Sequence, residues 1–142
     1  MKVSDYMNRH LVYLRAGDRV DLARRPMLEL GLTAVPILDE EHRPVGVVSL
    51  RDLIDERHRH PHVSEDVRVV IESASIEEAA RTLVAEDVHH LVVVDKDGAA
   101  VGMLSSMDLV RALTGAPPKH PASIERFVAA SGEDAQSEYR SE

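Results

Sequence analysis

One short pattern occurs twice in this sequence, and that repetition restricts the possible folds more than any other feature. The stretches VGVVSLRDLI and VGMLSSMDLV share a glycine, a serine three residues later, and an aspartate three residues after the serine. They lie 56 residues apart, which is the separation of Gly46 from Gly102. A repeat at a fixed separation indicates that one supersecondary unit is present in two copies. We therefore expect two halves with the same order of elements.

The first half predicts the order β-α-β-β-α. We expect a short strand at 11–14, a helix that is capped by Asp18 and ended by Gly31, two strands within 35–49, and a helix from about Arg51. The helical pieces have apolar residues at a spacing of three and four, whereas the paired strands flank a polar turn. Glycine at the end of a helix adopts the left-handed conformation without strain.

The second half predicts the same order with different residues. We expect a strand at 67–71, a helix capped by Ser75, two strands within 91–105, and a helix from Ser106 to about Gly115. The DKDG sequence between the two strands is typical of a hairpin turn. The predicted fold class is therefore α+β, with two tandem β-α-β-β-α repeats that pack with pseudo-two-fold symmetry.

Composition shifts divide the chain into four segments. The boundaries are a first repeat with a lead-in at 1–58, a linker at 59–66, a second repeat at 67–116 and a polar C-terminal tail at 117–142. Neither repeat is long enough to bury a sizeable core by itself, so we expect the two to pack together. Within the tail, SIERFVAA (123–130) is interpreted as a short helical segment.

Charge and composition argue against several classes of function. The net charge is −8 because the acidic residues outnumber the Lys and Arg that could neutralise phosphates. Aromatic residues, which stack on bases, make up only 3% of the chain, so no nucleic-acid partner is expected. The absence of cysteine excludes thiolate metal sites. No apolar run is long enough for a membrane helix and no signal peptide is recognised, so we expect a cytoplasmic protein without a membrane partner.

No motif of a known catalytic or metal site is present. The sequence lacks a GxxxxGK[ST] phosphate loop, a GxSxG elbow and an HExxH motif. His58, His60 and His62 alternate in a proline-containing segment, a spacing that does not build a tetrahedral metal site. We therefore expect no catalytic residue, no resident metal and no required cofactor.

The repeated serine and aspartate have two chemical interpretations. A serine where a strand meets a helix can donate to a phosphate, and an aspartate in the first helical turn can accept hydrogen bonds from two ribose hydroxyls. The same residues are also common helix caps, which stabilise a protein by about 1 kcal/mol without any ligand. The pairs concerned are Ser49 with Asp52 and Ser105 with Asp108.

The repeats resemble a tandem pair of cystathionine-β-synthase (CBS) domains, also called a Bateman module. The matching stretches are VPILDEEHRPVGVVSLRDL, LVVVDKDGAAVGMLSSMDL and the lead-in VSDYMNRHLVYL. The resemblance covers the chain from about Val3 to Leu113. It implies a regulatory module that binds an adenosine-containing ligand in the cleft between the repeats and that dimerises.

The resemblance also implies roles for individual residues. Asp52 and Asp108 would hold ribose, and Ser49 and Ser105 would approach phosphate. Arg51 could pair with a phosphate through its planar guanidinium, whereas Met107 at the same place in the second repeat could not. We therefore favour the first repeat for a charged phosphate ligand, and a solvated helix face is the equal alternative for Arg51.

The resemblance implies an adenine site built from backbone and apolar groups. In the first repeat the residues are Val12, Ala34 and Pro36. In the second repeat they are Arg68, His90 and Val92. His90 departs from an apolar wall, and it would either contact the ring or be a half-buried, satisfied side chain. Asn8 stands where relatives often have threonine, which puts any contact there in doubt.

Two main functions remain open at this point, and hydrolysis of a small nucleotide is a third, remote one. The first is sensing of AMP, ADP, ATP or a related compound, with Mg²⁺ as an optional companion of the ligand and an unidentified protein as the target. The second is a ligand-free homodimeric scaffold for protein interaction, in which the serine and aspartate are only caps. Leu28, Leu53 and Ile54 could serve a dimer interface or the core.

Overall fold

The computed structural model describes residues 1–54, 65–119, 124–127 and 139–141. These residues form two compact units, one around each repeat. The first-repeat unit is made of the described residues of Val12–Val67 and Glu125–Arg140. The second-repeat unit is made of Met1–Leu11, those of Arg68–Ile124, and Ser141. The predicted linker falls mostly outside the described residues, as do His58, His60 and His62.

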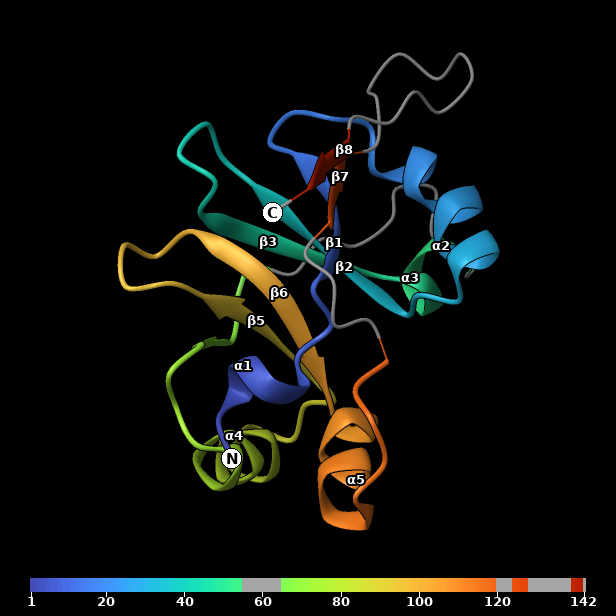
Figure 1. The fold of residues 1–142 in the computed structure, drawn as a ribbon. Helices are drawn as coiled ribbons and strands as arrows, with labels where there is room; N and C mark the ends of the chain where they lie inside the picture. The colour runs from blue at the N-terminus through green and yellow to red at the C-terminus, as the bar shows by residue number, and fades with distance from the viewer. Residues whose placement is uncertain (55–64, 120–123, 128–138, 142) are drawn as a thin grey trace. The chain divides into compact units, whose positions relative to one another are not determined.

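The first-repeat unit is built on a five-stranded sheet with the strand order β3-β2-β1-β7-β8 (Figure 1). Strand β1 runs parallel to β2, and β2 runs antiparallel to β3. Its repeat consists of β1 (His10–Arg15), η1 (Val20–Ala23), α2 (Arg24–Leu30), β2 (Ala34–Leu38), β3 (Pro44–Ser49) and α3 (Leu50–Ile54). The predicted order β-α-β-β-α is confirmed in this half.

The second-repeat unit has a three-stranded sheet with the order β4-β5-β6. Strand β4 is parallel to β5, and β5 is antiparallel to β6. Its elements are α1 (Val3–Tyr6), β4 (Val69–Ile71), α4 (Ile76–Glu86), β5 (His90–Val94), β6 (Ala100–Ser105) and α5 (Ser106–Thr114). Apart from α1, this half also follows the predicted order.

Strand pairing is identical in the two repeats. Ala34 pairs with Ser49 in the first repeat, and His90 pairs with Ser105 in the second. Both pairs are related by the shift of 56 residues found in the sequence. Each antiparallel ladder also changes register at the equivalent place, after Ile37 in β2 and after Val93 in β5. The duplicated sequence pattern thus corresponds to a duplicated backbone.

Each unit has its own hydrophobic core between the sheet and its helices. In the first-repeat unit the buried cluster comprises Val12, Leu14, Ala23, Met27, Val35, Ile37, Val48 and Leu53. In the second-repeat unit it comprises Val3, Met7, Ala74, Ile76, Ala79, Leu83, Leu91, Val93, Leu104, Leu109 and Ala112. Burial of apolar surface at this density is the main stabilising contribution in each unit.

The first helix of the first repeat begins differently from our prediction. Asp18 is not a helix cap, because its Oδ2 accepts a hydrogen bond from the backbone N–H of Arg15 at 2.9 Å and so closes the preceding turn. The helix starts instead with the 3₁₀ turn η1, whose N-cap is Arg19. Pro26 lies in the first turn of α2, where its missing N–H costs no hydrogen bond. Gly31 ends α2 in the left-handed conformation, as predicted.

The N-terminal lead-in packs with the second repeat, although its place in the sequence is beside the first. The backbone N–H of Val3 donates to the carbonyl of Ala74 at 2.8 Å. Asn8 and Met103 form an antiparallel bridge, with N···O distances of 2.7 and 3.1 Å. Gly102 permits this approach, because a Cβ there would lie 2.7 Å from the carbonyl oxygen of Asn8. The closest neighbour of Gly102 is thus the protein's own backbone.

The C-terminal segment contains two strands, and the first of them lies where we predicted a helix. Residues Ile124–Phe127 form β7 and Tyr139–Ser141 form β8. Strand β7 lies beside β1 in the sheet order, at the edge that would otherwise be open. An unpaired sheet edge offers backbone hydrogen bonds to any extended segment, which explains how tertiary context overrides the helical spacing of this stretch.

Candidate functional site

The junction between β3 and α3 positions the first candidate pair. Ser49 ends β3 opposite Ala34, and the backbone N–H of Leu50 donates to the carbonyl of Thr33 at 2.8 Å. This bond joins the first residue of α3 to the residue that directly precedes β2. Ser49 and Asp52 are consequently held together where the antiparallel ladder ends.

Ser49 and Asp52 form a local hydrogen-bonded pair. The hydroxyl of Ser49 donates to Oδ2 of Asp52 at 2.8 Å and accepts from the backbone N–H of Asp52 at 3.2 Å. Among the described residues, Asp52 uses only Oδ2 in hydrogen bonds, and Oδ1 has no such partner there. Asp52 is half-buried and Arg51 is exposed. This junction therefore has one open carboxylate oxygen next to an exposed guanidinium.

The equivalent junction of the second repeat is closed by more contacts. Oδ2 of Asp108 accepts from the backbone N–H of Ser105 at 2.8 Å and from its hydroxyl at 3.1 Å. The Ser105 hydroxyl in turn accepts from the backbone N–H of Asp108 at 3.3 Å, which completes a capping box. The guanidinium of Arg111 donates to Oδ1 of Asp108 at 2.9 Å. Both carboxylate oxygens of Asp108 are thus occupied.

Burial strengthens the difference between the two aspartates. Among the residues whose burial is described, Asp108 is the buried charged one, with 4% of its surface exposed. A buried carboxylate is tolerated when it is fully hydrogen-bonded and paired with a cation, as it is here by Ser105 and Arg111. Because Oδ1 already accepts from Arg111 and the carboxylate is almost fully buried, Asp108 offers less to a ribose hydroxyl than Asp52 does. The cap interpretation therefore describes the contacts at Asp108, whereas Asp52 retains an oxygen for a ligand.

The residues expected around adenine are mostly buried within their own units. Val12 belongs to the core of the first-repeat unit and Pro36 is buried in β2, whereas Ala34 is half-buried at the start of that strand. In the second-repeat unit, Val92 is 1% exposed and its backbone N–H donates to the carbonyl of Arg68 at 2.9 Å. The more accessible members are therefore Ala34 and His90, which pair with the serines, and Arg68, which is also half-buried.

His90 is half-buried, as we expected for the alternative in which it is a satisfied side chain. Burial lowers the pKa of His90 below its ordinary value of 6.5, His89 lowers it further, and Asp108 opposes the shift. The imidazole of His90 is consequently neutral at pH 7. A neutral imidazole has one donor and one acceptor nitrogen, which suits contact with a heteroaromatic base better than contact with a phosphate.

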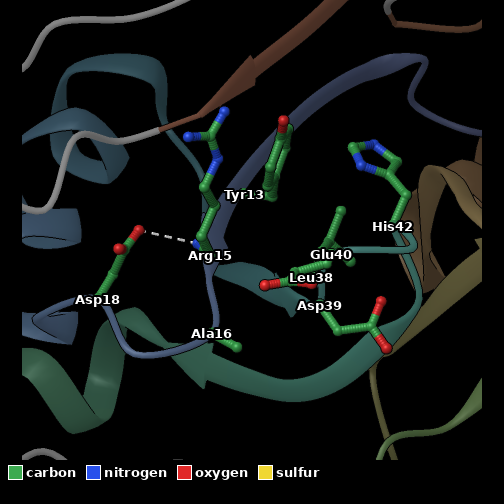
Figure 2. A pocket seen from close by; sticks show the side chains of 8 residues that line it. All are labelled: Tyr13, Arg15, Ala16, Asp18, Leu38, Asp39, Glu40 and His42. Atoms are coloured by element: carbon green, nitrogen blue, oxygen red, sulfur yellow. Dashed lines mark hydrogen bonds between the residues drawn. The ribbon is translucent and has the colours of Figure 1, made fainter.

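A cavity that our sequence analysis did not predict lies in the first-repeat unit. It has a volume of about 500 Å³ and is found where β1 and β2 end and their loops begin. Figure 2 shows Arg15 and Asp18 on one side, His42 on the other, and the ring of Tyr13 between Arg15 and His42. The rings of Tyr13 and His42 meet edge to face, with centroids 4.9 Å apart. Ser49 and Ala34 lie at the opposite end of β2 from this cavity.

Elsewhere in the described residues, no helix combines the length and the apolar character that a membrane span requires.

The family model and the solved structures that resemble this chain point to the same family. The family model for the CBS domain matches residues 3–59 and 62–115 of this chain. One similar solved structure is that of CBSX2, a CBS-pair protein from Arabidopsis thaliana, in complex with AMP. It is 29% identical to this chain in sequence, with a TM-score of 0.70. The match covers 80% of this chain and 96% of that one. The cytosolic domain of the Mg²⁺ channel MgtE in complex with ATP is 28% identical, with a TM-score of 0.64, over 75% of this chain and 46% of that one.

Curated relatives are longer than this chain. Homoserine O-acetyltransferase from Methanohalobium evestigatum is 28% identical over 114 residues, which are 77% of this chain and 23% of that enzyme. The chain spans less than half the length of the first two curated relatives that it matches.

Proposed function

Because this chain belongs to the CBS-domain family, we propose that it is a regulatory module that binds an adenosine-containing nucleotide. The proposal is supported by the AMP complex of CBSX2, which resembles this chain over 96% of its own length. The MgtE domain in complex with ATP supports the same ligand class. The shared chemistry of these ligands is adenine, ribose and phosphate.

We assign the ligand to the first repeat because the two serine–aspartate junctions differ. Asp52 has an open Oδ1 and lies beside the exposed Arg51, whereas Asp108 is closed by Ser105 and Arg111. A carboxylate with one free oxygen can accept from a ribose hydroxyl, and an adjacent guanidinium can pair with phosphate. We therefore assign ribose and phosphate to Asp52, Ser49 and Arg51 of the first repeat.

The remaining residues of the proposed site supply the base contacts. In the first repeat, Ala34 would face the adenine with the backbone of its strand, and the buried Val12 and Pro36 would contribute backbone groups or apolar walls. In the second repeat, His90 and Val92 would have the corresponding roles. Ser105 and Asp108 would contribute to a second site, in which the ribose would share Asp108 with Arg111. The first site is consequently expected to fill at lower ligand concentration.

We propose a regulatory role and not a catalytic one. The ligand would act by favouring one of two conformations or assemblies, and it can do so only as far as its affinity differs between them. No cofactor would be required, Mg²⁺ would enter only with a nucleotide triphosphate, and the protein would act in the cytoplasm. The similarity to homoserine O-acetyltransferase covers 23% of that enzyme, which leaves most of the enzyme without a counterpart in this chain.

A panel of nucleotides tests the proposal by thermal unfolding. AMP, ADP, ATP and S-adenosylmethionine, each with and without Mg²⁺, should raise the melting temperature, because a ligand that binds only the folded state stabilises it by mass action. GMP and CMP are the matched controls for the base. Unchanged melting temperatures with every adenosine compound at millimolar concentration would refute the proposal.

A ligand-free dimeric scaffold is the second candidate, and the capping box at Ser105 and Asp108 favours it. So do the exposed apolar side chains of α5, which are Met107, Val110 and Leu113. Of the residues named from the sequence, Leu53 is buried in the core, whereas Leu28 and Ile54 are exposed. This candidate predicts a dimer whose melting temperature does not respond to any adenosine compound.

A further inference from the structure

Helix α3 carries Arg51 and Asp52 of the proposed nucleotide site, and it is a short helix. It has five residues, Leu50–Ile54, whereas an isolated helix needs about 12–15 residues to be even marginally stable in water. The last carbonyls of a helix also have no partner within the helix itself. The orientation of α3, and with it that of Asp52, therefore depends on contacts with the rest of the first-repeat unit.

The equivalent helix of the second repeat closes its own end. Helix α5 has nine residues and stops at Gly115, which is in the left-handed conformation. The backbone N–H of Ala116 donates to the carbonyl of Arg111 at 2.9 Å, as is usual after such a glycine. The end of α5 is thus satisfied by residues that follow it directly in the sequence.

The end of α3 receives a hydrogen bond from another helix. Nη2 of Arg24, the first residue of α2, donates to the carbonyl oxygen of Leu53. A guanidinium is favourable there because the carbonyls at the end of a helix carry partial negative charge. At the shift of 56 residues, Ala80 of α4 takes the place of Arg24 and has no group that could form this bond. The contact between the two helices through a guanidinium is therefore particular to the first repeat.

Arg24 occupies a position that is unfavourable for its charge within its own helix. The first turn of a helix has partial positive charge, so acidic residues are preferred there and arginine is not. Arg25 has the same disadvantage, but its side chain is 89% exposed and pairs with Glu29 of the same helix. Among the described residues, only the first of these two neighbouring arginines has a hydrogen bond to α3. The contact with Leu53 offsets the unfavourable position of Arg24.

The bond from Arg24 lies one residue from Asp52. Leu53 follows Asp52 directly, and its side chain is buried in the core beside Ala23 and Met27. The other end of α3 is fixed by the bond from the N–H of Leu50 to the carbonyl of Thr33. Both ends of this short helix are thus held by residues outside it. A binding group that is held in place before the ligand arrives loses less entropy on binding.

We propose that Arg24 is a positioning residue for the nucleotide site of the first repeat. It touches neither ribose nor phosphate, and it acts by holding α3 so that the open Oδ1 of Asp52 is kept in place for a ribose hydroxyl. This inference rests on the proposed function, because it assigns Arg24 a role in that site. The second repeat has Ala80 instead, so the effect is confined to the first site.

The first experiment needs no ligand and uses the full chain. Hydrogen exchange is measured at the backbone N–H of Asp52, which donates to the hydroxyl of Ser49. In Arg24→Ala this exchange should become at least about threefold faster, because the end of α3 is released. Arg25→Ala is the matched control, since it removes the same charge from the neighbouring residue, and it should leave the exchange unchanged. An unchanged rate in Arg24→Ala would overturn the proposal.

The second experiment is calorimetric titration of AMP and of adenosine. Arg24→Ala should weaken both ligands about three- to tenfold, since both present ribose to Asp52. Arg24→Lys retains a donor and should recover part of the loss, and Arg25→Ala should bind both ligands as the wild type does. A loss confined to AMP would show that the guanidinium acts on the phosphate directly, and equal affinities in Arg24→Ala and the wild type would show that it has no role. Either result would overturn the proposal.

A double-mutant cycle separates positioning from a general loss of stability. If Arg24 acts through Asp52, Arg24→Ala should weaken AMP less in the Asp52→Asn chain than in the wild type. Losses that simply add would contradict the proposal. A wild type that binds no adenosine compound would instead refute the proposed function, whereas a wild type that binds AMP together with an Arg24→Ala chain of equal affinity refutes only the role of Arg24.

Discussion

Asp52 and Asp108 occupy equivalent places in the two repeats, yet their hydrogen-bond partners differ. Asp108 is held by Ser105 and Arg111, whereas Asp52 is held by Ser49 alone among the described residues. The sequence places Arg111 three residues after Asp108, a spacing that favours an ion pair on a helix. That spacing was a readable sign that the second aspartate has a structural role.

The two aspartates should differ in their effect on stability without ligand. Asp108→Ala removes a cap and leaves Arg111 without its partner, so it should lower the free energy of unfolding by about 2–3 kcal/mol. Asp52→Ala removes a cap contact and should cost about 1 kcal/mol. Urea denaturation of the two variants measures both values. Equal losses would contradict the distinction between the junctions.

His90 should make stability depend on pH. Because burial lowers its pKa in the folded state, the unfolded chain takes up a proton more readily as the pH falls through 6.5. The folded state is therefore destabilised below that pH and is unaffected above it. The urea midpoint should fall between about pH 7.5 and pH 5.5, and His90→Gln should reduce that fall. If the urea midpoint of His90→Gln depended on pH as strongly as that of the wild type, other groups would be the cause of the pH dependence.

At the scale of elements, the repeated pattern predicted the strands, their turns and the caps at Ser75 and Gly115. The hydroxyl of Ser75 accepts from the backbone N–H of Glu78 at 3.1 Å, and Gly115 ends α5 with φ 73°. These features depend on local chemistry, which one sequence displays. Strand β7 and the packing of the lead-in depend on which sheet edge is open, and that information is absent from local periodicity.

The bridge between Asn8 and Met103 should depend on Gly102. In Gly102→Ala the new Cβ would lie 2.7 Å from the carbonyl oxygen of Asn8, so the lead-in must move. The expected loss of stability is about 1–3 kcal/mol. Hydrogen exchange should accelerate at the N–H groups of Met103 and Asn8 while that of Val92, bonded to Arg68, changes less. Unchanged protection at Met103 would show that the bridge tolerates a side chain.

The candidate site was only partly predictable, because the sequence analysis depended on residues that repeat. The serine–aspartate pairs were found because they repeat, and comparison of Arg51 with Met107 separated the two copies. The cavity near Tyr13 and His42 was missed because most of its residues, Asp39 excepted, do not repeat. A search for polar residues that differ between otherwise equivalent turns would have found it.

At the scale of the whole molecule, exposed apolar side chains predict self-association. Leu113 is 83% exposed on α5, and Met107 and Val110 are exposed on the same helix. Removing such surface from water favours a dimer, which is also what the family resemblance implies. Analytical ultracentrifugation should show a dimer that Leu113→Glu weakens and that the surface control Lys96→Glu leaves intact. A monomeric wild-type chain would refute this prediction.

The most direct test of the nucleotide site is calorimetric titration of AMP into three forms of the full chain. The wild type should bind AMP, Asp52→Asn should bind at least about tenfold more weakly, and Asp108→Asn should bind with nearly unchanged affinity. The asparagine variants retain the shape and most of the capping capacity of the aspartates, so folding can be confirmed alongside. If Asp52→Asn bound AMP as tightly as the wild type, the assignment of ribose to Asp52 would be wrong.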